Sequence, residues 1–335
     1  MRAPGRKLDD GSVGPTVIPV VEVGALFDGD PTARVLADHT LYAAAREVGF
    51  ACIRGLPGDQ AFGPASRTCL LRIFGLDEAQ KRRLYRRKFS PHNRNLYRGW
   101  FPLQPGHPTY KEGIDMGGDI AHGAGIAASD DPLREPTPLP EEEDLPGWRV
   151  AVAAYYQTME QIAGILMRSL ARSLGLAEGY FDGSFRHGLS TLRLIRYPPR
   201  EAREFHLVGA PHTDSGFLTL LAQDGVGGLQ ARSRDGRWID VPPLEGTLVM
   251  NFGQVLEQWS AGRIRATEHR VLGSGLERYS IPFFYEARAD AIIAPLPTDP
   301  PDAFAPFAYG DFLWKRITSF VEFRGMDNER LEMSR

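Results

Sequence analysis

The sequence predicts a mainly β fold with α-helices: a double-stranded β-helix of the jelly-roll or cupin-like type, with a helical N-terminal half packed on it. Before about residue 185, apolar residues recur at helical spacing, whereas after Gly188 they form short strand-like runs broken by Gly, Pro, Asp and Asn. No linker-like segment or internal repeat separates the two parts. We therefore expect a flexible tail over residues 1–15 and a single domain over 16–335, with a mostly helical region over 16–185, a jelly-roll core over 186–295 and a C-terminal helical segment over 296–335.

The expected helices follow from apolar periodicity and from stop signals. Apolar side chains recur at helical spacing over residues 31–48, 62–74, 77–87 and 148–174. Gly49 and Gly175 stand where the first and last of these helices should end, because glycine is common just past a helix C-terminus. The third helix leads into a basic run from Lys81 to Lys88, which we interpret as a solvated helix face.

The expected strands are short and apolar, and they cover residues 17–21, 50–53, 192–197, 217–221, 248–252 and 281–285. Pro19 lies within the first run and indicates an edge strand, because proline cannot donate a hydrogen bond to a central ladder. Between Pro91 and Pro146 the regular pattern fades. We interpret this stretch as a long ordered loop, of the kind that often carries binding residues.

Composition excludes several classes of protein. The chain has 335 residues, 42% hydrophobic residues and a formal net charge of -3, which permits a sizeable core and shows no basic excess for nucleic acid. Cys52 and Cys69 lie in apolar surroundings and form no metal-binding or disulfide framework. The residues after Met1 are polar, so we expect neither a signal peptide nor a membrane anchor, and a cytoplasmic location. Nothing in the pattern indicates an oligomeric state.

Two histidines and an aspartate form the candidate catalytic and metal-binding set. His212 and Asp214 are spaced H-x-D, and in an extended segment such residues project to the same face and can reach one ion. Together with the distant His269 they match the two-His-one-carboxylate set, which leaves coordination positions on Fe(II) open. An H-x-D motif alone is more often incidental, and these ligands also suit zinc.

The joint pattern of motifs resembles the isopenicillin N synthase-like branch of the Fe(II)/2-oxoglutarate-dependent dioxygenases. The matching segments run through nearly the whole chain: Ile18–Val21, Gly49–Phe50, Gly55–Pro57, Arg98–Pro102, Lys111–Gly117, Arg193–Pro199, His212–Gly216, Asp224–Gln230, His269–Val271 and Arg278–Phe284.

The resemblance implies a cofactor and a co-substrate. It implies that His212, Asp214 and His269 bind Fe(II), and that the family's R-x-S pair, Arg278 and Ser280, holds the distal carboxylate of 2-oxoglutarate. A guanidinium presents a planar fork to a carboxylate, and a nearby hydroxyl adds a further hydrogen bond.

Two nearby positions complete the implied co-substrate site. Tyr197, directly before a proline, is implied to touch the same carboxylate. Ile195 departs from the family pattern, which often has asparagine there, so we expect no side-chain hydrogen bond from position 195 to the co-substrate.

The implied reaction is the oxidation of an unactivated C-H bond by Fe(II), 2-oxoglutarate and O2, through hydroxylation, desaturation or cyclisation, with succinate and CO2 as co-products. Relatives that halogenate replace the carboxylate ligand with a small residue, so Asp214 disfavours halogenation. Two alternatives remain open. One is a 2-oxoglutarate-independent oxidase or cyclase resembling isopenicillin N synthase, and the other is a non-redox metal-binding protein or zinc hydrolase.

The substrate is expected to be a small organic molecule of specialised metabolism. Aromatic residues suit its apolar body, and Arg98 suits an anionic group. The candidate substrate-binding residues are Tyr97, Arg98, Trp100, Phe101, Phe283 and Tyr285.

Overall fold

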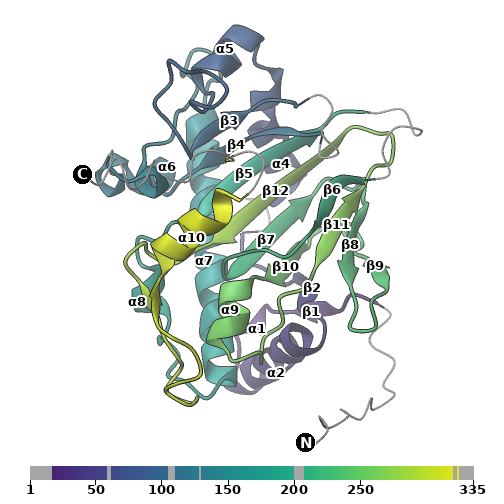
Figure 1. Ribbon diagram of the computed structural model, residues 1–335. Helices are drawn as coiled ribbons and strands as arrows, with labels where there is room; N and C mark the ends of the chain where they lie inside the picture. The colour runs from purple at the N-terminus through teal and green to yellow at the C-terminus, as the bar shows by residue number, and fades with distance from the viewer. Residues whose placement is uncertain are drawn as a thin grey trace, which may run out of the picture.

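Two β-sheets, a large one and a smaller one, form the centre of the protein (Figure 1). The structure is a computed structural model that describes residues 17–58, 62–104, 110–127, 130–199, 207–319 and 323. The tail expected over residues 1–15 lies outside these residues.

The large sheet has eight strands, and one of its edges is formed by β1, as Pro19 indicates. β1 pairs in parallel with β2, whereas the other pairs are antiparallel. The spatial order is β1 (Val20–Glu22), β2 (Phe50–Arg54), β10 (Leu248–Phe252), β7 (Leu218–Gln223), β12 (Arg278–Tyr285), β5 (Thr191–Tyr197), β4 (Glu112–Met116) and β3 (Gly99–Phe101).

The smaller sheet has four strands, and a separate pair of two-residue strands lies nearer the C-terminus. The four strands are, in spatial order, β6 (Leu207–His212), β11 (His269–Leu272), β8 (Leu229–Arg232) and β9 (Trp238–Asp240). The separate pair is β13 (Ile292–Ile293) and β14 (Phe307–Ala308).

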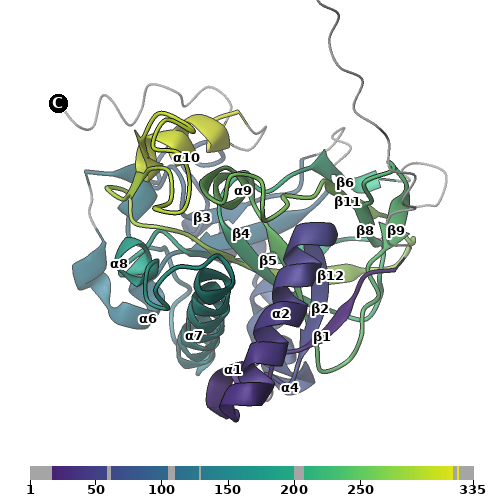
Figure 2. The same ribbon diagram turned by 90° about the horizontal axis from the view of Figure 1, so that it is seen from below.

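Two long helices, α2 (Pro31–Glu47) and α7 (Trp148–Ser173), cover one face of the large sheet (Figure 2). α2 begins at Pro31 with the Asp30 carboxylate accepting from the Ala33 N-H, and it ends before Gly49. Gly49 has φ +73°, and a Cβ there would lie 2.4 Å from the Arg265 carbonyl oxygen, so only glycine fits. The shorter helices are α1 (Ala25–Asp28), α4 (Pro64–Leu71), α5 (Glu78–Arg83), α6 (Asp119–His122), α8 (Asp182–Phe185), α9 (Gln254–Trp259) and α10 (Tyr309–Ile317).

Two apolar cores lie on opposite faces of the large sheet. The larger core fills the space between the sheet and the helices. The smaller core lies between the two sheets and includes Ile195, Tyr197, Val208 and Val271. This arrangement of a large and a small sheet with helices packed outside confirms the predicted fold class.

Two local expectations differ from the structure. β3 and β4 lie within the stretch interpreted as a loop, and both strands are buried along their whole length, so they lack the alternation that would reveal them. The basic run is also not one solvated face. α5 ends at Arg83, while Arg86 is fully buried and pairs with the buried Asp115, because pairing permits the burial of a charge.

Among the described residues, no helix is both long and apolar enough to cross a membrane. Cys52 is buried and Cys69 is partly buried, and neither forms a disulfide. Burial raises the pKa of the Cys52 thiol to about 11, so the thiol is protonated at neutral pH.

Candidate metal centre and co-substrate site

One face of the large sheet, the face turned toward the smaller sheet, carries the candidate site; we call it the site face. Directly paired residues on neighbouring strands lie on the same face. Asn251 pairs with Thr219, and Thr219 pairs with Phe284. Further along the strands, Ser280 pairs with Ile195. These side chains therefore all belong to the site face.

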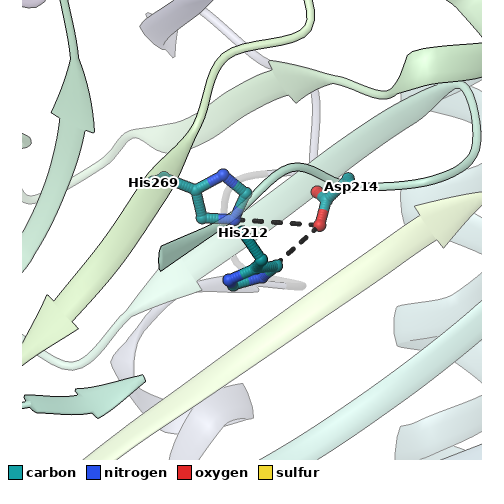
Figure 3. A group of neighbouring side chains, drawn as sticks. All are labelled: His212, Asp214 and His269. Atoms are coloured by element: carbon teal, nitrogen blue, oxygen red, sulfur yellow. Dashed lines mark ion pairs between the residues drawn. The ribbon is translucent and has the colours of Figure 1, made fainter. Parts of the chain in front are cut away.

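The two histidines of the candidate metal set come from neighbouring strands of the smaller sheet. His212 is the last residue of β6 and pairs directly with His269, the first residue of β11. Asp214 follows β6 in the connection to β7 (Figure 3). Its Oδ1 lies 3.8 Å from His212 Nε2 and 3.7 Å from His269 Nε2. These distances are too long for hydrogen bonds, and the ligand atoms lie within 4.8 Å of one another, so the three side chains could hold a metal ion.

The hydrogen bonds of the imidazoles orient their Nε2 atoms toward Asp214. His212 Nδ1 lies 2.8 Å from the Ala210 carbonyl oxygen, and His269 Nδ1 lies 3.1 Å from that of Thr267. A carbonyl oxygen only accepts, so each Nδ1 carries the proton and each Nε2 offers its lone pair, as in metal-binding histidines generally.

The ionisation of the set favours a cation. Burial and the neighbouring His269 lower the pKa of His212 to about 4, although 42% of its side-chain surface reaches solvent. Burial raises the pKa of Asp214, but the two histidines and two hydrogen bonds outweigh it, so the pKa is lowered overall. At neutral pH His212 is neutral and Asp214 is a carboxylate, the states that metal ligation needs.

Hydrogen bonds to the other carboxylate oxygen fix the direction of Asp214. Thr219 Oγ1 and Asn251 Nδ2 both donate to Oδ2 at 2.7 Å. The backbone is also held, because the Gln254 N-H donates to the Asp214 carbonyl at 2.9 Å. Gly253 lies so close to the connection that a Cβ there would come within 2.3 Å of the Gly216 carbonyl oxygen. The glycine therefore permits this close backbone approach.

The candidate co-substrate residues lie together on the site face. Arg278 pairs with Tyr197 across β12 and β5, and its guanidinium carbon lies 5.0 Å from the Tyr197 ring centre. Arg278 is 3% exposed, and its Nε donates to the Gly227 carbonyl at 2.9 Å. Its Nη1 is buried without a hydrogen-bond partner among the described residues. Such a group fits a carboxylate, because an unpaired buried donor is costly.

Ser280 and Ile195 lie on the site face near Arg278. Ser280 on β12 is 4% exposed and pairs with Ile195 on the neighbouring strand β5. Ile195 is an apolar side chain at a position where the family often has asparagine. The side chain at position 195 therefore supplies no hydrogen bond.

The residues expected to bind substrate are divided between the two faces of the sheet. Phe101 pairs with Gly113, which pairs with Ile195, so Phe101 belongs to the site face. Strand alternation puts Trp100, Phe283 and Tyr285 on the opposite face, where they belong to the helix-side core. The structure does not bring these three side chains to the metal set.

Tyr97 and Arg98 precede β3 and are buried, and both contact Thr191. The Tyr97 hydroxyl lies 3.3 Å from Thr191 Oγ1. The Arg98 guanidinium donates to Thr191 Oγ1 and to the carbonyls of Leu189 and Met116. The Arg98 guanidinium therefore donates hydrogen bonds to Thr191, Leu189 and Met116 of the protein itself.

Phe284 and Arg193 lie on the site face but were not among the predicted site residues. Phe284 is partly exposed and pairs with Thr219, beside the metal set. Arg193 pairs with the buried Asp115, with Nη2 2.8 Å from Oδ2, and its guanidinium carbon lies within 5.5 Å of the ring centres of Phe101 and Phe284. The signal that would have found Phe284 is its spacing from Arg278 and Ser280, since alternate residues of a strand share a face.

Comparisons with known proteins agree with this geometry. Residues 189–287 match the 2OG-Fe(II) oxygenase superfamily. A 2-oxoglutarate-Fe(II) type oxidoreductase of Aspergillus fumigatus is 30% identical over 82% of this chain and 83% of its own length. Isopenicillin N synthase of Streptomyces clavuligerus is 27% identical over 91% of this chain and 95% of its own length.

A solved structure supports the fold over almost the whole chain. A full-length Neurospora crassa protein in complex with alpha-KG and 5-formyluracil superposes with a TM-score of 0.78 at 25% identity, covering 96% of this chain and all of that protein. The chain therefore belongs to the 2OG-Fe(II) oxygenase superfamily and is an Fe(II)/2-oxoglutarate-dependent oxidoreductase.

Proposed function

We propose that His212, Asp214 and His269 would bind the catalytic Fe(II). Support comes from two Nε2 lone pairs and one carboxylate oxygen that converge at distances too long for hydrogen bonds. With 2-oxoglutarate and O2, iron bound in this way supplies the oxidation of an unactivated C-H bond, and succinate and CO2 are released.

We propose that Arg278, Ser280 and Tyr197 hold the distal carboxylate of 2-oxoglutarate. The single observation that carries this proposal is the buried Nη1 of Arg278, which has no hydrogen-bond partner among the described residues and lies on the site face, turned toward the smaller sheet. A carboxylate there gives the guanidinium an acceptor, and the Ser280 hydroxyl adds a donor. The apolar core between the sheets keeps water from the carboxylate and so strengthens the interaction.

We propose a small organic substrate that lies over the site face beside the metal. Phe284 and Phe101 offer apolar surface to such a molecule, and the Arg193 guanidinium lies close to both rings. Phe101 remains a candidate for substrate contact, and Phe284 and Arg193 replace Trp100, Phe283 and Tyr285, because they lie on the site face.

The proposed outcome is hydroxylation, desaturation or cyclisation. Asp214 retains the carboxylate ligand, which disfavours halogenation. A role in specialised metabolism, a cytoplasmic location and the absence of nucleic-acid and membrane partners are parts of the same proposal, and the formal net charge of -3 supports the exclusion of nucleic acid.

The experiment that tests the proposal measures succinate formation under air by protein reconstituted anaerobically with Fe(II) or with Zn(II), across a panel of small organic acids and amines. We expect succinate only with Fe(II) and 2-oxoglutarate, and more of it when an accepted substrate is present. Substrate oxidation without 2-oxoglutarate would instead support an oxidase like isopenicillin N synthase, and turnover with Zn(II) would support a hydrolase.

A further inference from the structure

The two oxygens of the Asp214 carboxylate have different surroundings. Oδ1 faces the Nε2 atoms of His212 and His269. Oδ2 accepts two hydrogen bonds, both 2.7 Å long, from Thr219 and Asn251. A carboxylate oxygen has about two lone-pair sites, so these donors occupy the capacity of Oδ2 and leave Oδ1 for a metal.

The two donors are fixed in place by the large sheet. Thr219 on β7 and Asn251 on β10 pair directly with each other and project from the same face. They are 5% and 3% exposed, so water does not readily replace the carboxylate as their partner. If Oδ2 turned toward a metal, a buried hydroxyl or amide would lose its hydrogen bond, which is unfavourable.

Hydrogen bonds also hold the backbone around Asp214 in place. The Asp214 carbonyl accepts the Gln254 N-H at 2.9 Å, and the Gly253 N-H donates to the Phe217 carbonyl at 2.9 Å. The connection from β6 to β7 is therefore attached to the start of α9 at Asp214 itself and at Phe217.

We propose that Thr219 and Asn251 are positioning residues that restrict Asp214 to metal ligation through one oxygen. The inference rests on the proposed function only in that Asp214 binds the metal. A two-His-one-carboxylate set is useful because it leaves coordination positions open. A second carboxylate oxygen would occupy one of these positions, so the two hydrogen bonds keep it available for the co-substrate or O2.

The test uses Thr219→Val and Asn251→Leu, singly and together, because each substitution removes the donor and approximately keeps the shape. Thr219→Ser, which retains a hydroxyl, is the matched control. Each protein is loaded with Mn(II) and 2-oxoglutarate, and metal-bound water is measured from the broadening of the Mn(II) electron paramagnetic resonance signal in isotopically labelled water. Dissociation constants for Mn(II) and for 2-oxoglutarate are measured separately, and circular dichroism checks the fold.

We expect the wild-type protein and Thr219→Ser to keep a metal-bound water in the presence of 2-oxoglutarate, and the double variant to lose it. The dissociation constant for 2-oxoglutarate should rise by a larger factor than that for Mn(II) in the double variant, because a second bound carboxylate oxygen would occupy a position that the co-substrate needs. Thr219→Val alone should move both measurements in the same direction, and it decides the matter if the double variant does not fold.

Two results would overturn the inference. One is a folded variant that keeps the bound water and the wild-type affinity for 2-oxoglutarate. The other is an equal loss of affinity for Mn(II) and 2-oxoglutarate, which would mean that the donors only support metal binding. A wild-type protein that fails to bind Mn(II) or Fe(II) would contradict the proposed function itself.

Discussion

The immediate neighbours of His212 and Asp214 determine the protonation states of these two residues before any ion binds. Two backbone carbonyls hold the protons of His212 and His269 on Nδ1, and desolvation together with the neighbouring His269 lowers the pKa of His212. The carboxylate of Asp214 has a lowered pKa because the histidines and two donors outweigh the effect of burial. His212 and Asp214 therefore release few protons when a cation binds at neutral pH.

The first residue-scale prediction concerns Asp214. Asp214→Ala removes the only anionic ligand of the set, so we expect loss of Fe(II) binding and of oxygenation. Iron content after anaerobic reconstitution and succinate formation under air measure the two effects. Asp240→Ala on β9, which removes an exposed carboxylate of the smaller sheet, is the matched control and should leave both unchanged. Substantial hydroxylation by Asp214→Ala would exclude its role as an essential ligand.

The second residue-scale prediction concerns Arg278. Arg278→Gln should weaken 2-oxoglutarate binding by about 2–5 kcal/mol, the usual effect of truncating one partner of a buried charge pair. Calorimetric titration of the Mn(II)-loaded protein with 2-oxoglutarate checks this. Arg270→Gln on β11 is the control, since Arg270 hydrogen-bonds to Gln230 and stacks on Trp238. Equal affinity of the Arg278 variant and the wild type would mean that the carboxylate binds elsewhere.

At the scale of elements, the alternation of β12 separates the chemistry of the site from the packing of the core. Arg278, Ser280 and Phe284 project to the site face, whereas Phe283 and Tyr285 project to the helix side, where Phe283 contacts Tyr156. One strand therefore contributes to both faces of the sheet, and adjacent residues have different roles.

Adjacent phenylalanines on β12 provide the third prediction. Phe283 is fully buried, so Phe283→Ala should lower the free energy of unfolding by about 3–5 kcal/mol. Phe284→Ala should lower it less, because Phe284 is partly exposed, and should raise KM for an accepted substrate without changing 2-oxoglutarate binding. Denaturant unfolding and steady-state kinetics measure the two effects. The reverse pattern would contradict the assignment of faces.

The same strands show which features of the fold and of the site could be predicted from the sequence and which could not. The run of apolar residues predicts the latter part of β12, and the motifs predict His212, Asp214, His269, Arg278 and Ser280. The motifs do not include Phe284 as a site residue, although alternation along β12 puts it on the face of Arg278 and Ser280 and puts Phe283 on the other face. Thr219 and Asn251 escaped prediction because they act across strands whose pairing is non-local, and β3 and β4 because both are buried throughout.

At the scale of the whole molecule, the buried carboxyl groups of Asp115 and Glu286 contact residues that are distant in the sequence. Their contributions to the stability of the fold depend on pH in opposite directions. Asp115 lies between Arg86 and Arg193, which lower its pKa against the effect of burial. Its contribution to stability is present above the unfolded pKa of about 3.9 and is lost as the pH falls through its folded value.

Glu286 has the opposite behaviour. It lies against Gly216 and accepts a hydrogen bond from Tyr309 of α10, and burial raises its pKa from 4.5 to about 8. The folded state therefore binds more protons than the unfolded state between these values. The contribution of Glu286 is present below the unfolded pKa and is lost as the pH rises toward about 8.

The fourth prediction follows from this sign. Glu286→Gln keeps a neutral side chain at every pH, so its stability relative to the wild type should increase between about pH 5 and pH 8, by an amount on the order of a few kcal/mol. Denaturant unfolding of both proteins across this range measures the difference. A difference that stays constant or that falls with pH would contradict the raised pKa.

The measurement that tests the central claim most directly is an anaerobic titration of the Fe(II)-loaded protein with 2-oxoglutarate, followed by its metal-to-ligand charge-transfer absorption. We predict that the absorption appears in the wild type, needs more 2-oxoglutarate in Arg278→Gln and is absent in Asp214→Ala. A folded wild-type protein that binds Fe(II) but never develops the absorption would contradict the account.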